Sequence, residues 1–171
     1  MSNVILIGMP GSGKSTVGVM LAKQLGCGFV DVDLVIQDRE QALLQDLLDE
    51  HGVEAFLDME RDAVCSLHPR RCVIATGGSA VCRPDAAAHL KTLGTLVYLR
   101  TPVEELRRRI ANLSTRGIAA LPGQTLEDIL AAREPLYTQY ADLVLDCPAE
   151  QSMARTVELL CSRLAHLGLG R

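Results

Sequence analysis

Aromatic residues are scarce in this sequence: they make up 3% of its 171 residues, and tryptophan is absent. Proteins that bind single-stranded nucleic acid stack bases on aromatic side chains, and nucleic-acid-binding domains carry an excess of basic residues. Here the formal net charge is −4 at pH 7. We therefore expect no nucleic-acid partner, whereas small anions, which need only local positive charge, remain possible ligands.

Long hydrophobic runs are also missing. The first apolar run, residues 4–7, has the length of a strand and leads straight into Gly8, so neither a signal peptide nor a membrane span is indicated. The six cysteines are scattered, without a CxxC pair or histidines at metal-ligand spacing. This pattern favours reduced thiols. We expect a cytoplasmic protein with no membrane partner.

What the sequence does contain is a series of five short apolar segments separated by longer helical patterns. The segments lack polar alternation, which is typical of parallel strands covered on both faces. The length fits one core, so we expect residues 1–171 to form a single doubly wound α/β domain. The expected strands are 4–7, 27–32, 72–75, 96–99 and 143–145. The expected helices are 15–25, 41–50, 53–67, 85–93, 103–111, 125–140 and 152–167.

The segment GMPGSGKS, residues 8–15, follows the first expected strand and precedes the first expected helix. This is the Walker A pattern in the context that it requires. Glycines let backbone amides approach phosphate oxygens closely, and the helix N-terminus behind them favours an anion. Lys14 would then contact the β- and γ-phosphates, and the Ser15 hydroxyl would ligate magnesium. The segment predicts binding of ATP with Mg²⁺.

A pair of aspartates ends the second expected strand. Alternation along a strand would place Asp31 and Asp33 on the same side, at the edge where ligands bind in parallel sheets. Two carboxylates there could divide the work of holding the metal and accepting the proton of an acceptor hydroxyl.

The Walker A segment, the two aspartates and Thr76-Gly77-Gly78 after the third strand together resemble the shikimate kinase family, from residue 4 to about 146. The resemblance implies a P-loop NTPase three-layer sandwich, with a five-stranded parallel sheet of order 2-3-1-4-5 and helices on both faces. It implies a helical acceptor-binding segment at about 34–62 and a lid at about 112–124.

The resemblance also implies roles for individual residues. The nucleotide would be bound by Gly11, Ser12, Gly13, Lys14, Ser15, Thr16, Arg109 and Arg116, and the metal by Ser15 and Asp31. The acceptor would contact Asp33, Gly77, Gly78 and Arg133, and its binding site would include Leu57 and Arg61. Arg109 would cover the adenine, and Arg133, before Pro-Leu-Tyr, would grip a carboxylate with its planar guanidinium. Lys14, Asp33 and Arg116 would be the catalytic residues.

Three positions depart from the family pattern. A second carboxylate-gripping arginine is expected in a Phe-Arg-x-x-Glu sequence, but that position is Leu57 here. Ser79 replaces the third glycine of a triplet, and Gly117 replaces the proline after the lid arginine. One missing arginine removes about 1.5 to 3 kcal/mol of binding free energy. Arg61, one helical turn further on, could reach back and restore the contact.

Several acceptors are therefore open. The acceptor is shikimate, converted to shikimate 3-phosphate, or another small hydroxy acid or amino acid such as homoserine, whose ammonium could pair with Asp58 or Asp33. A nucleoside or nucleotide kinase, disfavoured by the short lid and few aromatics, and a non-catalytic ATP-binding regulatory protein are the other classes. We expect a monomer.

Overall fold

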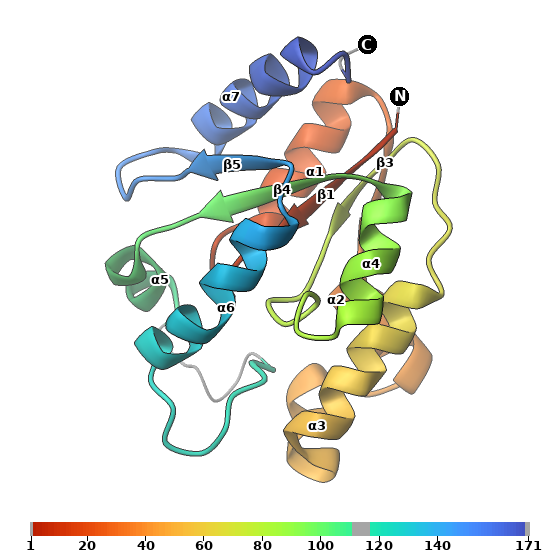
Figure 1. The fold of residues 1–171 in the computed structure, drawn as a ribbon, viewed down its shortest axis with the longest axis vertical. Coiled ribbons are helices and arrows are strands. Elements are labelled where there is room, and N and C mark those ends of the chain that lie inside the picture. The colour runs from red at the N-terminus through yellow and green to blue at the C-terminus, as the bar shows by residue number, and fades with distance from the viewer. Residues whose placement is uncertain (1, 111–116, 170–171) are drawn as a thin grey trace.

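The computed structural model describes residues 2–110 and 117–169, and its centre is a parallel sheet of five strands (Figure 1). The strands are β1 (Asn3–Ile7), β2 (Gly28–Asp31), β3 (Cys72–Ala75), β4 (Gly94–Arg100) and β5 (Leu143–Asp146). Their order is β2-β3-β1-β4-β5, and every neighbouring pair is parallel. The predicted fold class and strand order are confirmed.

Helices in the described part of the chain connect these strands or, in the case of the last helix, follow the final strand. They are α1 (Lys14–Leu25), α2 (Val32–Glu40), α3 (Leu44–Cys65), α4 (Pro84–Leu93), α5 (Val103–Arg109), α6 (Leu126–Tyr140) and α7 (Met153–His166). The two helices predicted at 41–50 and 53–67 form the single element α3, which is kinked at Gly52, where φ is 80°. Among the described residues no helix is both long and apolar enough to cross a bilayer.

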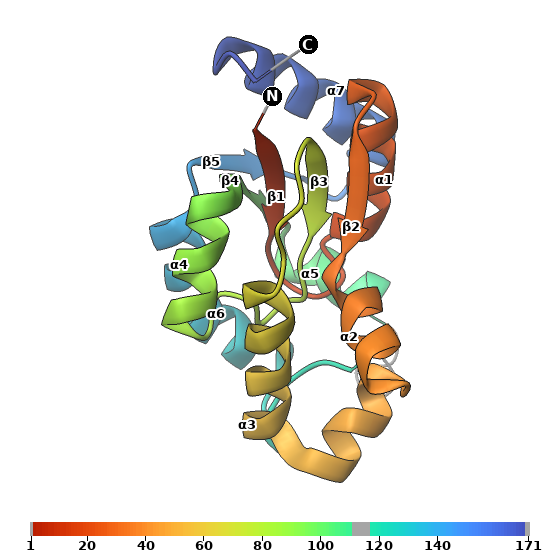
Figure 2. The same ribbon diagram turned by 90° about the vertical axis from the view of Figure 1, so that its right-hand side faces the viewer.

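Each face of the sheet has its own hydrophobic cluster. In β1, Val4 and Leu6 point toward α1 and α7, while Ile5 and Ile7 point toward the cluster formed with α3, α4 and α6. All four side chains are fully buried, which explains why the strand reads as a continuous apolar run. Figure 2 shows α1 and α7 on one side of the sheet and α4 and α6 on the other.

The helix α2 lies largely within the helical acceptor-binding segment that the family resemblance implies, although the apolar pattern alone does not predict it, and it corrects the interpretation of the second strand. The strand β2 ends at Asp31 rather than at residue 32, because the Asp31 carboxylate accepts a hydrogen bond from the Asp33 amide at 3.1 Å and caps α2. The following apolar residues Val32 and Ile36 are one helical turn apart and both buried. Val32 was therefore wrongly predicted to be the last residue of the strand.

The connections that follow β1, β2 and β3 all lie at the carboxyl edge of the sheet, where ligands bind in doubly wound folds. The helix α3 extends beyond this edge (Figure 2). Gln45 near the start of α3 accepts a hydrogen bond through Oε1 from the Gly117 amide at 3.1 Å. The segment after residue 116 is thereby joined to α3 at the edge where the site forms.

Candidate active site

The loop between β1 and α1 has the conformation that the GMPGSGKS segment requires. Gly11 and Gly13 have φ values of 78° and 91°, which residues with a Cβ rarely adopt. A Cβ on Gly11 would lie 2.7 Å from Ile110 Cγ1, and one on Gly13 would lie 2.8 Å from Met153 Cε. Gly13 is also the N-cap of α1. The loop and the first turn of α1 therefore present backbone N–H groups to one site, which suits an anion.

Lys14, the first residue of α1, lies across this loop. Its Nζ donates hydrogen bonds to the backbone oxygens of Gly8 and Met9, both at 2.8 Å. Burial lowers the pKa of Lys14 to about 8, against the opposing effect of the Asp33 and Glu60 carboxylates. An anion bound by the loop would stabilise the charged ammonium and so raise this pKa.

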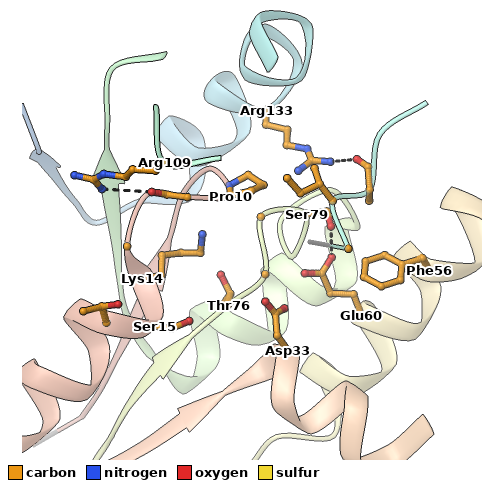
Figure 3. Close-up of a pocket in the computed structure, with 18 of the residues that line it drawn as sticks. Pro10, Lys14, Ser15, Asp33, Phe56, Glu60, Thr76, Ser79, Arg109 and Arg133 are labelled. Atoms are coloured by element: carbon orange, nitrogen blue, oxygen red, sulfur yellow. Dashed lines mark hydrogen bonds between the residues drawn. The ribbon is translucent and has the colours of Figure 1, made fainter. Parts of the chain in front are cut away.

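A cavity of about 420 Å³ extends from this loop toward α3 and α6 (Figure 3). Most of the predicted site residues line it: Gly11, Gly13, Lys14, Ser15, Thr16, Asp33, Gly77, Gly78, Arg109 and Arg133. Ser12 is buried beneath the loop, with its Oγ 3.5 Å from Lys14 Nζ. The structure thus brings together residues that are more than a hundred positions apart in the sequence.

The sequence predicted that the two aspartates lie on the same side of a strand, and this prediction is wrong. Asp31 is the N-cap of α2, whereas Asp33 belongs to the first turn of α2 and lines the cavity. Burial raises the pKa of Asp33, and the nearby Lys14 ammonium opposes that rise. Both carboxylates nevertheless lie close enough to the nucleotide loop to act on the pKa of Lys14. The start of α2, and not alternation along a strand, gives them these positions.

Arg133 enters the cavity from α6. The residue is only 7% exposed, and its Nη2 donates a hydrogen bond to the backbone oxygen of Ala119. Its Nη1 is buried and has no hydrogen-bond partner among the described residues. A buried guanidinium with an unused donor costs free energy unless a ligand accepts from it. This atom is the strongest indication of an anionic group at the α6 end of the cavity.

Glu60 and Ser79 form a pair in the cavity wall that the sequence analysis did not assign. Glu60 is 2% exposed, and its Oε2 accepts a hydrogen bond from the Ser79 hydroxyl. Burial raises the pKa of Glu60 to about 7, although the bond from Ser79 acts in the opposite direction. In the sequence, Glu60 could have been recognised as the final glutamate of the Phe-Arg-x-x-Glu family pattern, which is retained here although the arginine is not.

Gly77 lies against both carboxyl groups of the cavity. A Cβ at this position would lie 2.1 Å from Glu60 Oε1 and 2.9 Å from Asp33 Oδ1, so the two oxygens are within a few ångströms of each other. Figure 3 shows Asp33 between Lys14 and Glu60. Glycine leaves this space free, whereas a Cβ would require the Glu60 carboxyl group to shift, and this accounts for the glycine after the third strand.

Two predicted acceptor contacts are not brought into the cavity. Leu57 is half-buried and packs against the hydrophobic cluster on this face of the sheet. Arg61 turns outward, where its guanidinium pairs with Asp58 at 3.1 Å and with Asp62 at 2.9 Å. Asp58 also pairs with Arg83 at 3.0 Å. Arg61 therefore does not replace the missing arginine as a contact for the acceptor carboxylate. Asp58 is likewise paired with arginines and is not placed to bind an acceptor ammonium.

Arg109 lies at the nucleotide end of the cavity, at the end of α5. Its Nη1 donates to the backbone oxygen of Gly11 at 3.3 Å, and its Nε donates to Glu105 Oε1 at 2.7 Å. The predicted catalytic residue Arg116 lies outside the described residues, as does the first half of the predicted lid. The described remainder contributes Gly117, Ile118 and Ala119 to the cavity wall.

The arrangement has two functional ends. The loop, Lys14 and Arg109 can hold a polyphosphate at one end, while Arg133 can hold a carboxylate at the other. Asp33 lies along the cavity between them, positioned to accept a proton from a group bound in the middle. Within the described residues, no group of three or more histidine, cysteine, aspartate or glutamate side chains converges to hold a metal ion.

Comparison with known proteins gave concordant matches. The family model described as "Shikimate kinase" matches residues 10–164. A shikimate kinase of Paracidovorax citrulli is 36% identical over 98% of this chain and 94% of its own length, and one of Stenotrophomonas maltophilia is 37% identical over 92% and 89%. The structure of shikimate kinase from Acinetobacter baumannii in complex with shikimate superposes with a TM-score of 0.86, at 31% identity, covering 97% of this chain and 94% of that one.

Proposed function

The chain belongs to the shikimate kinase family, and from this membership we propose that it transfers the γ-phosphoryl group of ATP to a hydroxyl of shikimate, giving shikimate 3-phosphate and ADP. The main support for placing this reaction in the cavity is the Nη1 atom of Arg133, which is buried without a hydrogen-bond partner among the described residues at the end opposite the phosphate-binding loop. A carboxylate on the acceptor would satisfy that donor.

The donor end of the cavity would hold the triphosphate of ATP. Backbone amides of the loop around Gly11 and Gly13 face the phosphates, and Lys14 would exchange its bonds to the loop carbonyls for bonds to phosphate oxygens. Arg109, at the rim of the loop, would cover the adenine.

A magnesium ion fits this end of the site. Mg²⁺ takes oxygen ligands and is usually held by one or two protein side chains together with phosphates and water. The exposed Ser15 hydroxyl in the first turn of α1 and the Asp31 carboxylate supply such oxygens. When bound, the ion would neutralise charge on the phosphate oxygens.

Asp33 would act on the acceptor hydroxyl. The hydroxyl oxygen attacks the γ-phosphorus, a new P–O bond forms as the bond to the β-phosphate oxygen breaks, and the hydroxyl proton passes to the Asp33 carboxylate. Burial raises the pKa of Asp33 and strengthens it as a proton acceptor, whereas Lys14 keeps the carboxylate form accessible. Arg116, from the lid, would stabilise the transferring group.

The oligomeric state and the cellular compartment can also be proposed from the described residues. We propose that the chain acts as a monomer, since one chain supplies both ends of the cavity. We also place it in the cytoplasm, because all six cysteines are free, which suits a reducing compartment.

The direct test is a coupled ADP-release screen with shikimate, homoserine, gluconate and a set of nucleosides as acceptors. We expect magnesium-dependent turnover with shikimate well above that with the other acceptors. Turnover with homoserine or a nucleoside in place of shikimate would refute the assigned acceptor. Release of ADP with none of them, from protein that binds ATP with magnesium, would favour a regulatory ATP-binding protein.

A further inference from the structure

Glu60 is a buried carboxyl group that the phosphoryl transfer described above does not use. It lies on α3 in the wall of the acceptor end of the cavity, and its Oε2 accepts a hydrogen bond from the Ser79 hydroxyl. The position where the family pattern has an arginine is Leu57, and Arg61 pairs with Asp58 and Asp62 instead. Within the described residues, Glu60 therefore forms no ion pair with an arginine or a lysine.

Charged and titratable groups face Glu60 from every element packed around it. They are Lys14 on α1, Asp33 on α2, Arg133 and Tyr137 on α6, and Cys82 in the connection after β3. The carboxyl oxygens of Asp33 and Glu60 converge on Gly77, so their charges repel each other at short range. Arg133 is close enough to stabilise the Glu60 carboxylate.

An acceptor carboxylate changes this balance. When it binds to the free Nη1 of Arg133, it neutralises one of the two cations that offset the charge of Glu60, the other being the Lys14 ammonium. The carboxylates of the acceptor, Asp33 and Glu60 would then face only the Arg133 guanidinium and the Lys14 ammonium, which leaves an excess of one negative charge. A buried excess of negative charge is costly, and the ordinary response of a carboxyl group is to take up a proton.

We propose that Glu60 takes up a proton when the acceptor carboxylate binds to Arg133, so that Glu60 and its partner Ser79 make acceptor affinity dependent on pH and limit the pocket to acceptors of low negative charge. The proton comes from the solvent and returns to it when the product leaves. This inference rests on the proposed function, because it requires an acceptor with a carboxylate. Burial already raises the pKa of Glu60 to about 7 before an acceptor binds, so the uptake falls near neutral pH.

The experiment is isothermal titration calorimetry of shikimate into the full-length protein at pH 6 and pH 8.5, with pH 7.5 measured in Hepes and in Tris. These buffers differ in protonation enthalpy and so report the number of protons taken up. A carboxylate several ångströms away at an effective dielectric constant near 20 raises the pKa of Glu60 by one to two units. We expect a Kd about tenfold weaker at pH 8.5 than at pH 6, and uptake of roughly half a proton or more at pH 7.5.

Three variants separate this effect from other titrations. Glu60→Gln should bind shikimate without proton uptake and with a Kd that is nearly independent of pH. Ser79→Ala removes a hydrogen bond that favours the Glu60 carboxylate, so its transition should move to higher pH. Glu50→Gln changes a carboxylate on the same helix whose side chain is 75% exposed, and it should behave as the unaltered protein. Circular dichroism confirms that each variant is folded.

Binding of shikimate with a constant Kd and no proton uptake in the unaltered protein would overturn this inference and leave the proposed function intact. Proton uptake that persists in Glu60→Gln, or an unshifted transition in Ser79→Ala, would assign the titration to another group and also overturn it. Failure of shikimate to bind at any pH, in protein that binds ATP with magnesium, would overturn both the inference and the proposed acceptor.

Discussion

Replacement of Arg133 by methionine tests whether the buried guanidinium is the anchor of the acceptor. Methionine retains much of the aliphatic length and can fill the buried space between α6 and the segment that contains Ala119. It removes the charge, the free Nη1 donor and the hydrogen bond from Nη2 to the Ala119 oxygen. The phosphate loop and Lys14 are untouched, so the change acts on one end of the cavity.

The expected magnitude follows from the bonds that are lost. Hydrogen bonds to charged groups contribute about 1.5 to 3 kcal/mol, and one such bond to the acceptor carboxylate corresponds to a rise in KM for shikimate of roughly 10- to 150-fold. The unpaired Ala119 oxygen should lower the free energy of unfolding by about 1 kcal/mol. The Kd for ATP with magnesium should change by less than about twofold, because no contact to the nucleotide end is removed.

The assay is steady-state ADP release with shikimate varied at saturating ATP, accompanied by calorimetry of ATP binding and by thermal unfolding. Arg107→Met is the matched control: Arg107 lies on α5, its side chain is 60% exposed, and within the described part of the chain its ion pair is with Glu127 at the surface. A surface ion pair contributes about 1 kcal/mol or less, so this control should leave both KM values unchanged.

A KM for shikimate that changes less than about threefold in folded Arg133→Met would refute the reasoning, since the carboxylate would then bind elsewhere. Equal losses of shikimate and ATP affinity would also refute it, because they would mean that Arg133 supports the whole site.

Two further changes probe the remaining parts of the cavity. Lys14→Met should abolish detectable ADP release while the circular dichroism spectrum stays unchanged, because a buried ammonium with a lowered pKa contributes charge for the phosphates rather than stability; measurable turnover would contradict its role. Gly77→Ala should lower the free energy of unfolding by about 1 to 3 kcal/mol in a thermal or urea titration, because the new Cβ would overlap Glu60 Oε1. A second change, Glu60→Ala, should then recover part of that loss, and additive losses would show that the overlap is not the cause.

The parts that the sequence predicted correctly depend on short-range patterns. The run at β1, the glycines of the loop and the start of α1 are neighbours in the chain, and each residue choice follows from a local backbone requirement. The five apolar runs predicted five strands, and the family resemblance supplied their order. Lys14, Asp33 and Arg133 were selected by motif and line one cavity, although their chemical roles remain predictions.

What only the tertiary structure decided concerns contacts between distant residues and competition between local alternatives. The choice between strand and helix after Asp31 depended on its carboxylate turning back to cap α2, a geometry that a run of apolar residues does not reveal. Glu60 and Ser79 are each ordinary in sequence, and their pairing appears only when α3 and the connection after β3 are packed together. Likewise, Arg61 turned outward because three acidic residues surround it there. Burial and charge balance depend on the whole fold. They determine the protonation state of Glu60, whose position the sequence alone does not reveal.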